Sequence, residues 1–508
     1  MKLYCTFILI CVAIMLSGTA LAQQNEKLPP VVHPTMGTTA HSKSGEITLT
    51  ITGQKQNFKG CNKALQDTDV WSPKSVHFMP GGKKYYVNSL EGCLTVVYDA
   101  ATNKKLSVIK HHFVPQNEYL WARPSGLFPF THYAKMGRLL RYFWGRPVES
   151  CFSHGGRYLW VPYYRRDFDL NAQDPSAIAV IDTRADTLVR VMETGPLPKM
   201  VALSPDGKTL AVTHWGNNTV GFIDVAGTDP KQWHWKSVVV VDKQLKLTYS
   251  LTQKVDRDNH SGYLLRGTVF TPDGHYLLVG CMGGGGGIAV IDVAKMRYVG
   301  RLTGLWNARH LVISHDYLYL SINNPGIVQR MPLSQALQAV KQLTASKKRT
   351  LDLSKGWEQC KVGRGARTIA LSPDGRWAFA ACNAASAIYV VDTRTMRVAS
   401  SIAVDSYPVG LDLSADGSQL IVTSQGRKGH GGNALTLIKI DYAHPQQAPV
   451  MRGGIEQAQE VPFWPDRAMA WWQQWHKPAA VGLALVAALV VVWLIAWGIR
   501  RRERDKEF

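Results

Sequence analysis

A unit of four short strands recurs along this sequence at intervals of about 40 residues, stretched in places by insertions. The clearest copy runs from Arg367 to Val404. Its first strand, Ile369–Leu371, enters the turn Ser372-Pro-Asp-Gly375, where Pro and Gly suit a tight reversal. Strands at Trp377–Ala381, Ala387–Val391 and Arg397–Val404 follow. Because one such unit cannot bury both of its faces, a repeat of this kind predicts the blades of an all-β propeller.

The turn identifies seven copies of this unit, which predicts a seven-bladed β-propeller. A third strand ending in aspartate follows in six of them, and the fifth copy has Arg330 at that place. The turns begin at Met79, Ser153, Ser204, Thr271, Ser314, Ser372 and Ser414.

The last copy does not contain a fourth strand of its own. Its strands lie near Val409, Leu420 and Leu435, while the alternating segment Glu46–Thr52 precedes the first copy and belongs to no blade. We expect this segment to complete blade seven and so to close the ring without an open sheet edge.

The motifs SPDG, NNTVGFIDV and SAIYVVDT also resemble the YVTN-type β-propeller repeat family. The resemblance covers roughly Gly45 to Tyr442. It implies the propeller fold, and because relatives include cofactor-binding and lactone-hydrolysing propellers it permits an enzyme without indicating one.

Both ends of the chain carry membrane-targeting patterns. Residues 1–22 predict a signal peptide, with Lys2, an apolar run and the cleavage site Ala20-Leu-Ala22. Residues 23–44 then form a predicted linker. After the propeller, taken as 45–445, and a juxtamembrane linker at 446–477, the apolar stretch 478–499 is long enough to be a transmembrane helix. The arginines in the tail 500–508 favour a cytoplasmic C-terminus, and hence a propeller in the periplasm tethered to a bacterial inner membrane.

Positive charge is concentrated at one position of the repeat. The chain has a net charge of +21, which favours anionic partners or simply a soluble basic surface. Five residues before the first turn residue, where each innermost strand begins, five of the seven blades have Lys or Arg, and Arg146 and His310 lie next to this phase. We expect these side chains to line one mouth of the channel and to bind an anion, unless they point outward and shield strand edges. The seven positions are Lys74, Val148, Lys199, Arg266, Arg309, Arg367 and Val409.

Two insertions interrupt the repeat. Within residues 111–147, the segment Thr131–Gly145 has the spacing of an amphipathic helix, which we interpret as a lid over the mouth or as a membrane-surface helix. Leu333–Leu343 predicts a second, structural helix on the opposite face within blade five. The run Gly283–Gly287 fits no phosphate-binding motif and predicts a flexible or close-packed turn.

The cysteines permit two disulfides. Cys61 and Cys93 fall on one face of blade one, and Cys360 and Cys382 take the matching places around blade six. In an oxidising compartment these pairs predict two bonds, with Cys151 and Cys281 free; the alternative is six buried thiols.

No sequence motif identifies a catalytic centre or a cofactor. The chain lacks CxxCH, HExxH, GxSxG and a Cys/His cluster at metal spacing. The sequence therefore favours a membrane-anchored propeller that binds an anionic small molecule, envelope polymer or lipid at its basic mouth. Two alternatives stay open: a periplasmic oxidoreductase or hydrolase that uses the same funnel, and a scaffold for a membrane protein partner. Nucleic acid is not expected as a partner.

Overall fold

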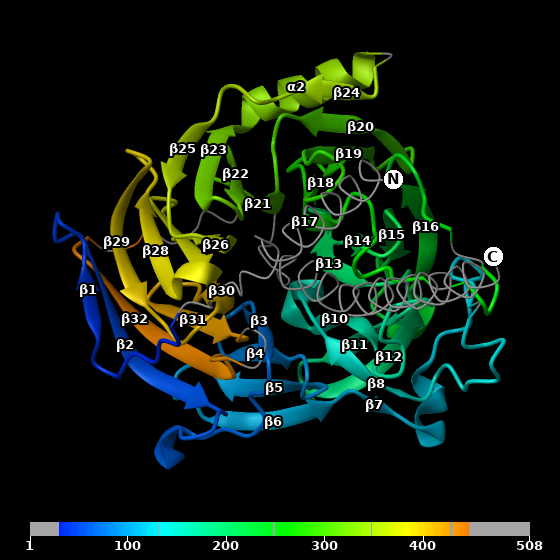
Figure 1. The fold of residues 1–508 in the computed structure, drawn as a ribbon, viewed down its shortest axis with the longest axis horizontal. Coiled ribbons are helices and arrows are strands. Elements are labelled where there is room, and N and C mark those ends of the chain that lie inside the picture. Colours follow the sequence, from blue (N-terminus) through cyan, green and yellow to red (C-terminus); the bar gives the residue numbers. More distant parts are fainter. Residues whose placement is uncertain are drawn as a thin grey trace, which may run out of the picture. The chain divides into compact units, whose positions relative to one another are not determined.

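Seven antiparallel sheets form a closed ring in the computed structural model of this protein. The structure describes residues 30–446 apart from 131, 247–248, 254, 347, 427–429 and 445. Figure 1 shows the sheets arranged around a centre, and the strands nearest this centre include β3, β13, β17, β21, β26 and β30. Neighbouring innermost strands contact one another from blade to blade, including the last blade and the first. The seven-bladed all-β propeller predicted from the repeat is confirmed.

In the described residues four of the blades have four strands each, blades four and seven have five, and blade two has six. Blade one contains β3 (Pro73–Phe78), β4 (Lys84–Ser89), β5 (Leu94–Asp99) and β6 (Lys105–Lys110). Blade two contains β7 (His112–Phe113), β8 (Phe143–Pro147), β9 (Cys151–Ser153), β10 (Tyr158–Arg166), β11 (Ala177–Asp182) and β12 (Thr187–Glu193). Blade three contains β13 (Pro198–Leu203), β14 (Thr209–His214), β15 (Thr219–Asp224) and β16 (His234–Val240).

The remaining blades follow in chain order. Blade four contains β17 (Leu265–Phe270), β18 (Tyr276–Cys281), β19 (Ile288–Asp292), β20 (Arg297–Thr303) and β24 (Thr350–Asp352). Blade five contains β21 (Ala308–Ser314), β22 (Tyr317–Ile322), β23 (Ile327–Pro332) and β25 (Glu358–Lys361). Blade six contains β26 (Ala366–Leu371), β27 (Trp377–Cys382), β28 (Ala387–Asp392) and β29 (Arg397–Ala403). Blade seven contains β1 (Thr39–His41), β2 (Ile47–Gln56), β30 (Pro408–Leu413), β31 (Gln419–Ser424) and β32 (Ala434–Tyr442).

The repeated turn is held by its own side chains. In blade six the hydroxyl of Ser372 lies 2.5 Å from a carboxylate oxygen of Asp374 and accepts from the amide of Trp377 at 2.9 Å. The same carboxylate accepts from the amide of Arg376 at 3.0 Å. These local bonds satisfy backbone groups that the hairpin leaves unpaired, which is why the SPDG pattern specifies the reversal.

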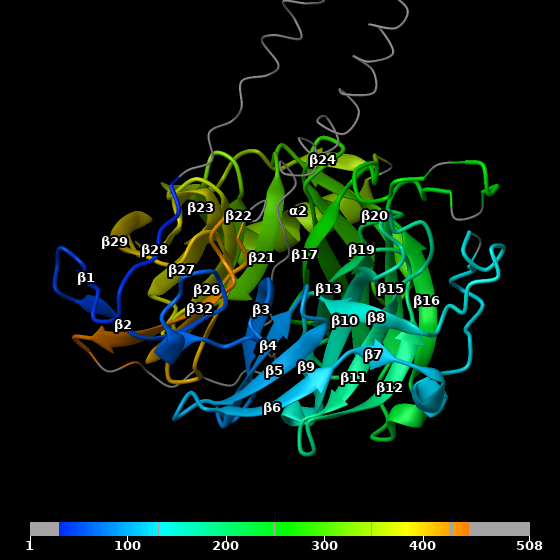
Figure 2. The same ribbon diagram turned by 60° about the horizontal axis from the view of Figure 1, so that its bottom comes forward.

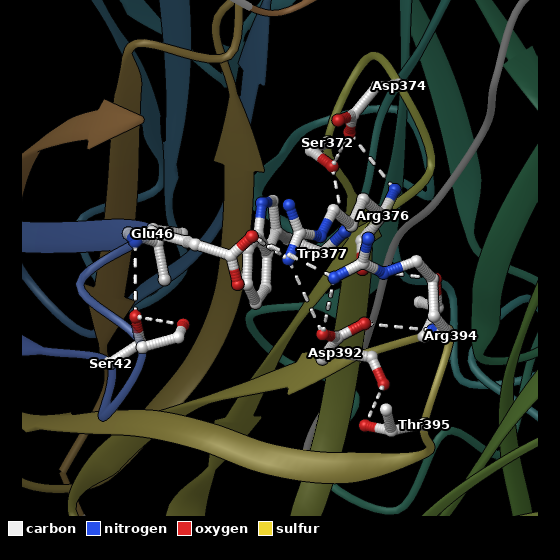
Figure 3. Close-up of polar contacts among 12 residues, drawn as sticks. Ser42, Glu46, Ser372, Asp374, Arg376, Trp377, Asp392, Arg394 and Thr395 are labelled. Atoms are coloured by element: carbon white, nitrogen blue, oxygen red, sulfur yellow. Dashed lines mark hydrogen bonds and ion pairs between the residues drawn. The ribbon is translucent and has the colours of Figure 1, made fainter. Parts of the chain in front are cut away.

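The N-terminal strand closes the ring as predicted. β2 pairs antiparallel with β32, from Ile47 opposite Tyr442 to Gln56 opposite Ala434, and so becomes the fourth strand of blade seven. Glu46 lies just before this strand and points toward Arg376 and Asp392 of blade six (Figure 3). Blade seven is therefore built from both ends of the domain, which leaves no unpaired gap between them.

The helix in blade five also forms. α2 spans Leu333–Ala345 and buries Leu333, Ala336, Val340 and Leu343. It packs against β20 as well as β22 and β23, so it lies along the outer rim of the ring rather than on the face opposite the basic residues (Figure 1).

The predicted helix at Thr131–Gly145 is wrong. In the described part of this segment, residues 133–137 form a turn and the chain becomes β8 from Phe143 onward. Gly137 adopts a φ of +72°, which ends helical geometry at that point. Phe143 and Trp144, at the end of the predicted helix, instead begin β8, and Phe143 packs in the core beside Phe113 and Trp121.

The predicted signal peptide, the helix 478–499 and the tail 500–508 all lie outside the described residues. None of the helices within the described ranges has the length and apolar character that a membrane crossing requires.

Candidate site at the basic channel mouth

Each innermost strand contains a one-residue β-bulge at the repeat position that is Lys or Arg in five of the seven blades. In blade one, Pro73 pairs with Ser89 and Ser75 with Asn88, so that Lys74 is the extra residue. Register shifts of the same size include Lys199, Arg266, Arg309, Arg367 and Val409, and in blade two the shift falls between Pro147 and Cys151, around Val148. A bulge re-aims the side chain of the extra residue, which removes these positions from the ordinary alternation along the strand.

Local chemistry stabilises the bulges. The residue immediately before the basic phase is proline in four blades, namely Pro73, Pro147, Pro198 and Pro408. After the bulge, a hydroxyl of the second strand often accepts the displaced amide: Thr213 accepts from Met200 at 3.1 Å, and Thr423 accepts from Gly410 at 3.0 Å. The irregularity is therefore built into both strands of the hairpin.

The five basic residues at this position are all buried, and none is more than 2% exposed. We call them together the basic mouth: Lys74, Lys199, Arg266, Arg309 and Arg367. Burial lowers the pKa of Lys199 well below its ordinary value, and the charges of Arg266, Lys74, Arg165 and Arg309 lower it further. Because these charges come from blades one, two, four and five, they act on Lys199 from several sides of the ring. The expectation that the side chains shield outer strand edges is not what the structure shows.

Aromatic side chains support the cations of blades three and four. The ammonium of Lys199 lies 3.6 Å from the ring centre of Tyr164 and 5.1 Å from that of Trp215. The guanidinium of Arg266 lies 4.2 Å from the same indole. Cation–π contacts of this kind offset part of the cost of removing a charge from water.

Other members of the basic mouth have different neighbours. Lys74 donates to the side-chain oxygen of Gln425 at 2.8 Å, and one Arg309 nitrogen lies 3.4 Å from the sulfur of Met282. Arg367 is the second residue of β26, at the matching register, and is fully buried. The mouth thus combines charge with the apolar cluster that contains Leu90, Val148, Trp215, Leu264 and Met282.

Arg146 and His310 occupy places different from those expected. Arg146 forms an ion pair with Glu91 at 3.0 Å and remains partly exposed, so it lies at the edge of the mouth. His310 is buried, and its Nδ1 accepts from the amide of Ile369 in blade six at 3.2 Å. Burial and the charge of Arg309 lower its pKa to about 3, so this ring is neutral at physiological pH and joins two blades.

A buried carboxylate faces the basic mouth, and the repeat gives no sign of it. Asp258 belongs to the link between β16 and β17, and the hydroxyl of Tyr164 donates to its carboxylate at 2.5 Å. Arg165 lies 3.5 Å from the same carboxylate, and the indole of Trp215 donates to the Asp258 backbone oxygen at 3.2 Å. Burial raises the pKa of Asp258 well above its ordinary value, while the charge of Arg266 lowers it.

These additional residues could be found from the sequence only in part. Tyr164 and Arg165 lie at the end of β10 and Trp215 directly follows β14, so all three lie where a second strand ends, on the same face as the start of the antiparallel innermost strand. Figure 2 shows the link after β16 at the end of the ring opposite the hairpin that joins β11 and β12. Asp258 lies in a long link without strand pattern, so nothing in the sequence places it against Arg266.

The cysteines are thiols in this structure. Cys93, Cys151, Cys281, Cys360 and Cys382 are buried and Cys61 is partly exposed. Cys360 and Cys382 share one apolar cluster between blades five and six. The two disulfides, Cys61–Cys93 and Cys360–Cys382, stay a prediction for an oxidising compartment.

The polar groups described at the mouth are ammonium, guanidinium, phenol and carboxylate groups. Within residues 30–446, leaving aside the masked positions, no three His, Cys, Asp or Glu side chains gather as a metal site. The run Gly283–Gly287 forms a close-packed turn, because a Cβ on Gly286 would meet the backbone oxygen of Leu305 at 2.3 Å.

The fold defines the class of the protein as a seven-bladed β-propeller, and the comparisons with known proteins add little beyond it. No protein-family profile matches the sequence. Antigen Lp49 of Leptospira interrogans is 24% identical over 213 residues, which are 38% of this chain and 41% of that protein. The chain thus matches less than half the length of this curated relative.

Two solved structures are similar at low sequence identity. A chain of Kuenenia stuttgartiensis hydrazine synthase is 14% identical with a TM-score of 0.49, and the match covers 75% of this chain and 99% of that one. The Cps50 (Swd1) β-propeller domain of Myceliophteria thermophila is 11% identical with a TM-score of 0.48, over 73% of this chain and 96% of that one.

Proposed function

We propose that the protein is a receptor that binds an anionic ligand, either a small molecule or a component of the cell envelope, at the basic mouth. The observation that carries the proposal is that five blades place a buried Lys or Arg at one repeated bulge, and that four of these cations, from blades one, three, four and five, lie close enough to interact electrostatically. Like charges that are buried close together repel one another, and an anionic ligand at the mouth would offset this repulsion.

The terminal segments suggest where this receptor acts. The patterns at 1–22 and 478–499 support export and anchoring in a bacterial inner membrane, with the propeller in the periplasm and residues 500–508 in the cytoplasm. The repeat motifs further support membership of the YVTN-type propellers. In that setting the accessible anions are carboxylated or phosphorylated metabolites, envelope polymers and lipid head groups.

The test compares single neutralisations in the full-length protein in detergent. Arg309→Ala and Arg367→Ala remove members of the basic mouth, whereas Arg184→Ala removes an exposed arginine from the hairpin between β11 and β12. Binding of citrate, phosphate and heparin is measured by calorimetry. A charge-assisted contact contributes about 1.5 to 3 kcal/mol, so each mouth variant should bind the preferred anion roughly tenfold more weakly or worse.

The control decides between a specific site and a generally basic surface. Arg184→Ala should bind as the unmodified protein does, because exposed charges are screened over about 8 Å at physiological salt. Equal losses in all three variants, or normal binding by both mouth variants, would show that anion binding is not located at the mouth.

A further inference from the structure

The described residues 255–264, which we call the inner link, precede β17 and contact blade two. The amide of Arg257 donates to the backbone oxygen of Asn171 at 3.0 Å, and its Nε lies 3.3 Å from the oxygen of Gln173. Both acceptors belong to the loop between β10 and β11. The inner link is thereby fastened to a different blade from those it joins in sequence.

The fastened link brings a carboxylate into the basic mouth. Asp258 is 5% exposed, and its carboxylate lies in a pocket formed by Tyr164, Arg165 and Arg266. Lys199 packs against the Tyr164 ring, so the same phenol touches both the buried acid and a buried cation. The cations that the proposed function assigns to an external anion thus already have an acidic side chain of the protein beside them.

We propose that Asp258 is an internal substitute for the ligand, and that the inner link is displaced when an external carboxylate takes its place. This inference rests on the proposed function and specifies the ligand as a carboxylate-bearing molecule. The pocket holds a flat, two-oxygen group by one phenol hydroxyl and one neighbouring guanidinium, which suits a carboxylate. An external carboxylate that takes the place of the Asp258 side chain faces the same cations, so the exchange avoids exposing the cations to each other.

Competition by the internal group sets the apparent affinity. A ligand that binds only the open form has its dissociation constant multiplied by the inverse of the open fraction. Replacing Asp258 by Asn removes the competing charge while preserving its size. Citrate should then bind about tenfold or more tightly, because one charge-assisted contact no longer holds the link closed.

The matched control is Asp242→Asn. Asp242 lies two residues after β16 and is exposed, and its carboxylate accepts from the hydroxyl of Tyr263 in the inner link. This variant therefore loses the same charge outside the pocket. Calorimetry on the full-length protein in detergent should show tighter citrate binding for Asp258→Asn alone. The affinity for phosphate should increase less than the affinity for citrate, since the vacated pocket is shaped for a carboxylate.

A second measurement needs no substitution. Arg257 is 2% exposed when the link is closed, so trypsin should cut after it slowly. Saturating citrate should make this cut faster in the unmodified protein, and sodium chloride at equal ionic strength should not.

The outcomes separate this inference from the proposed function. Displacement of the link would be overturned if Asp258→Asn bound citrate no more tightly than the unmodified protein and if citrate protected Arg257 from trypsin. Weaker anion binding by Arg309→Ala would then still support the proposed anion site. If Asp258→Asn increased the affinity for phosphate more than the affinity for citrate, the proposal that the ligand carries a carboxylate would be overturned. Failure of every anion to bind either protein would overturn both proposals.

Discussion

Glu46 and Arg376 form an ion pair of 2.5 Å between the closing strand and the neighbouring blade. Asp392 lies 3.7 Å from the same guanidinium, and the guanidinium stacks on Trp377 at 4.5 Å. Arg376 therefore connects the N-terminal segment to the second and third strands of blade six. The contact fixes β2 at the point where the ring closes.

Removing the closing strand should destabilise the whole propeller. Deleting residues 23–52 takes away most of β2 and exposes the edge of β32, so the loss is not confined to a frayed end. Thermal unfolding followed by circular dichroism should move to clearly lower temperature. Glu46→Gln, which keeps the strand, should have a much smaller effect. An unchanged melting curve after the deletion would contradict closure by this strand.

Relieving the charge at the mouth should stabilise the protein while abolishing its binding. The pKa of Lys199 is lowered by burial and by four neighbouring cations, so the charged form costs free energy near neutral pH. Lys199→Met removes this cost and keeps a long apolar side chain, which should raise the free energy of unfolding by about 1 to 3 kcal/mol. Urea unfolding in anion-free buffer measures it. A lower stability would mean that Lys199 holds the blades together.

Acid should destabilise the fold through buried neutral histidines. Burial lowers the pKa of His111 and His214 to about 3, and burial together with Arg309 does the same for His310. In the unfolded chain these groups titrate near 6.5, so the unfolded state binds more protons between these values. The stability is fully present above pH 6.5 and is lost as the pH falls toward 3, by up to about 1.4 kcal/mol per pH unit for each histidine.

One variant tests this assignment. His111 lies 2.8 Å from the hydroxyl of Thr95 and 2.9 Å from that of Tyr163, contacts that its neutral ring satisfies. His111→Gln lowers stability at pH 7 but should make stability less dependent on pH between 6.5 and 4.5. Urea unfolding at both pH values is compared with that of His275→Gln, an exposed histidine. Parallel pH profiles for all three proteins would refute the role of His111.

Peptide mapping of the unreduced protein tests the disulfides. The prediction is that Cys61 is joined to Cys93 and Cys360 to Cys382 after export, with Cys151 and Cys281 as thiols. Burial raises the pKa of Cys151 and Cys281 to about 12, so neither forms much thiolate, the reactive species. Any other partner for Cys61 would end the proposal.

Reporter fusions test the predicted orientation. A reporter after Phe508 should be active only in the cytoplasm, and a chain that ends before residue 478 should be released as soluble periplasmic protein. A C-terminal reporter that is active in the periplasm would exclude the anchoring that we propose.

The sequence predicted the elements that repeat and missed those that occur once. The hairpin turn, of which SPDG is the clearest form, and the apolar strands around it recur seven times, so an error at one copy is corrected by the others. Even the split blade seven could be foreseen. Thr131–Gly145 has no second copy. Its helical spacing was overridden by Gly137 and by the pairing of β8 with β10, which is a tertiary contact.

The site shows the same division. The basic phase was visible because it repeats, and the prolines at Pro73, Pro198 and Pro408 directly before it are a sequence signal that marks the bulge. Asp258 was invisible, because its place depends on the path of one long link across to blade two. Sequence spacing could not show that an acid lies among the cations.

The bulges also determine how this mouth can change. Each charged side chain occupies an inserted position that the hydrogen-bonded ladder does not use, so its chemical identity is independent of strand pairing. Val148 and Val409 occupy the same position without charge, and their blades have the same register shift. A propeller of this type can therefore gain or lose charge one blade at a time, so that related chains could be tuned to ligands of different valence on an unaltered scaffold.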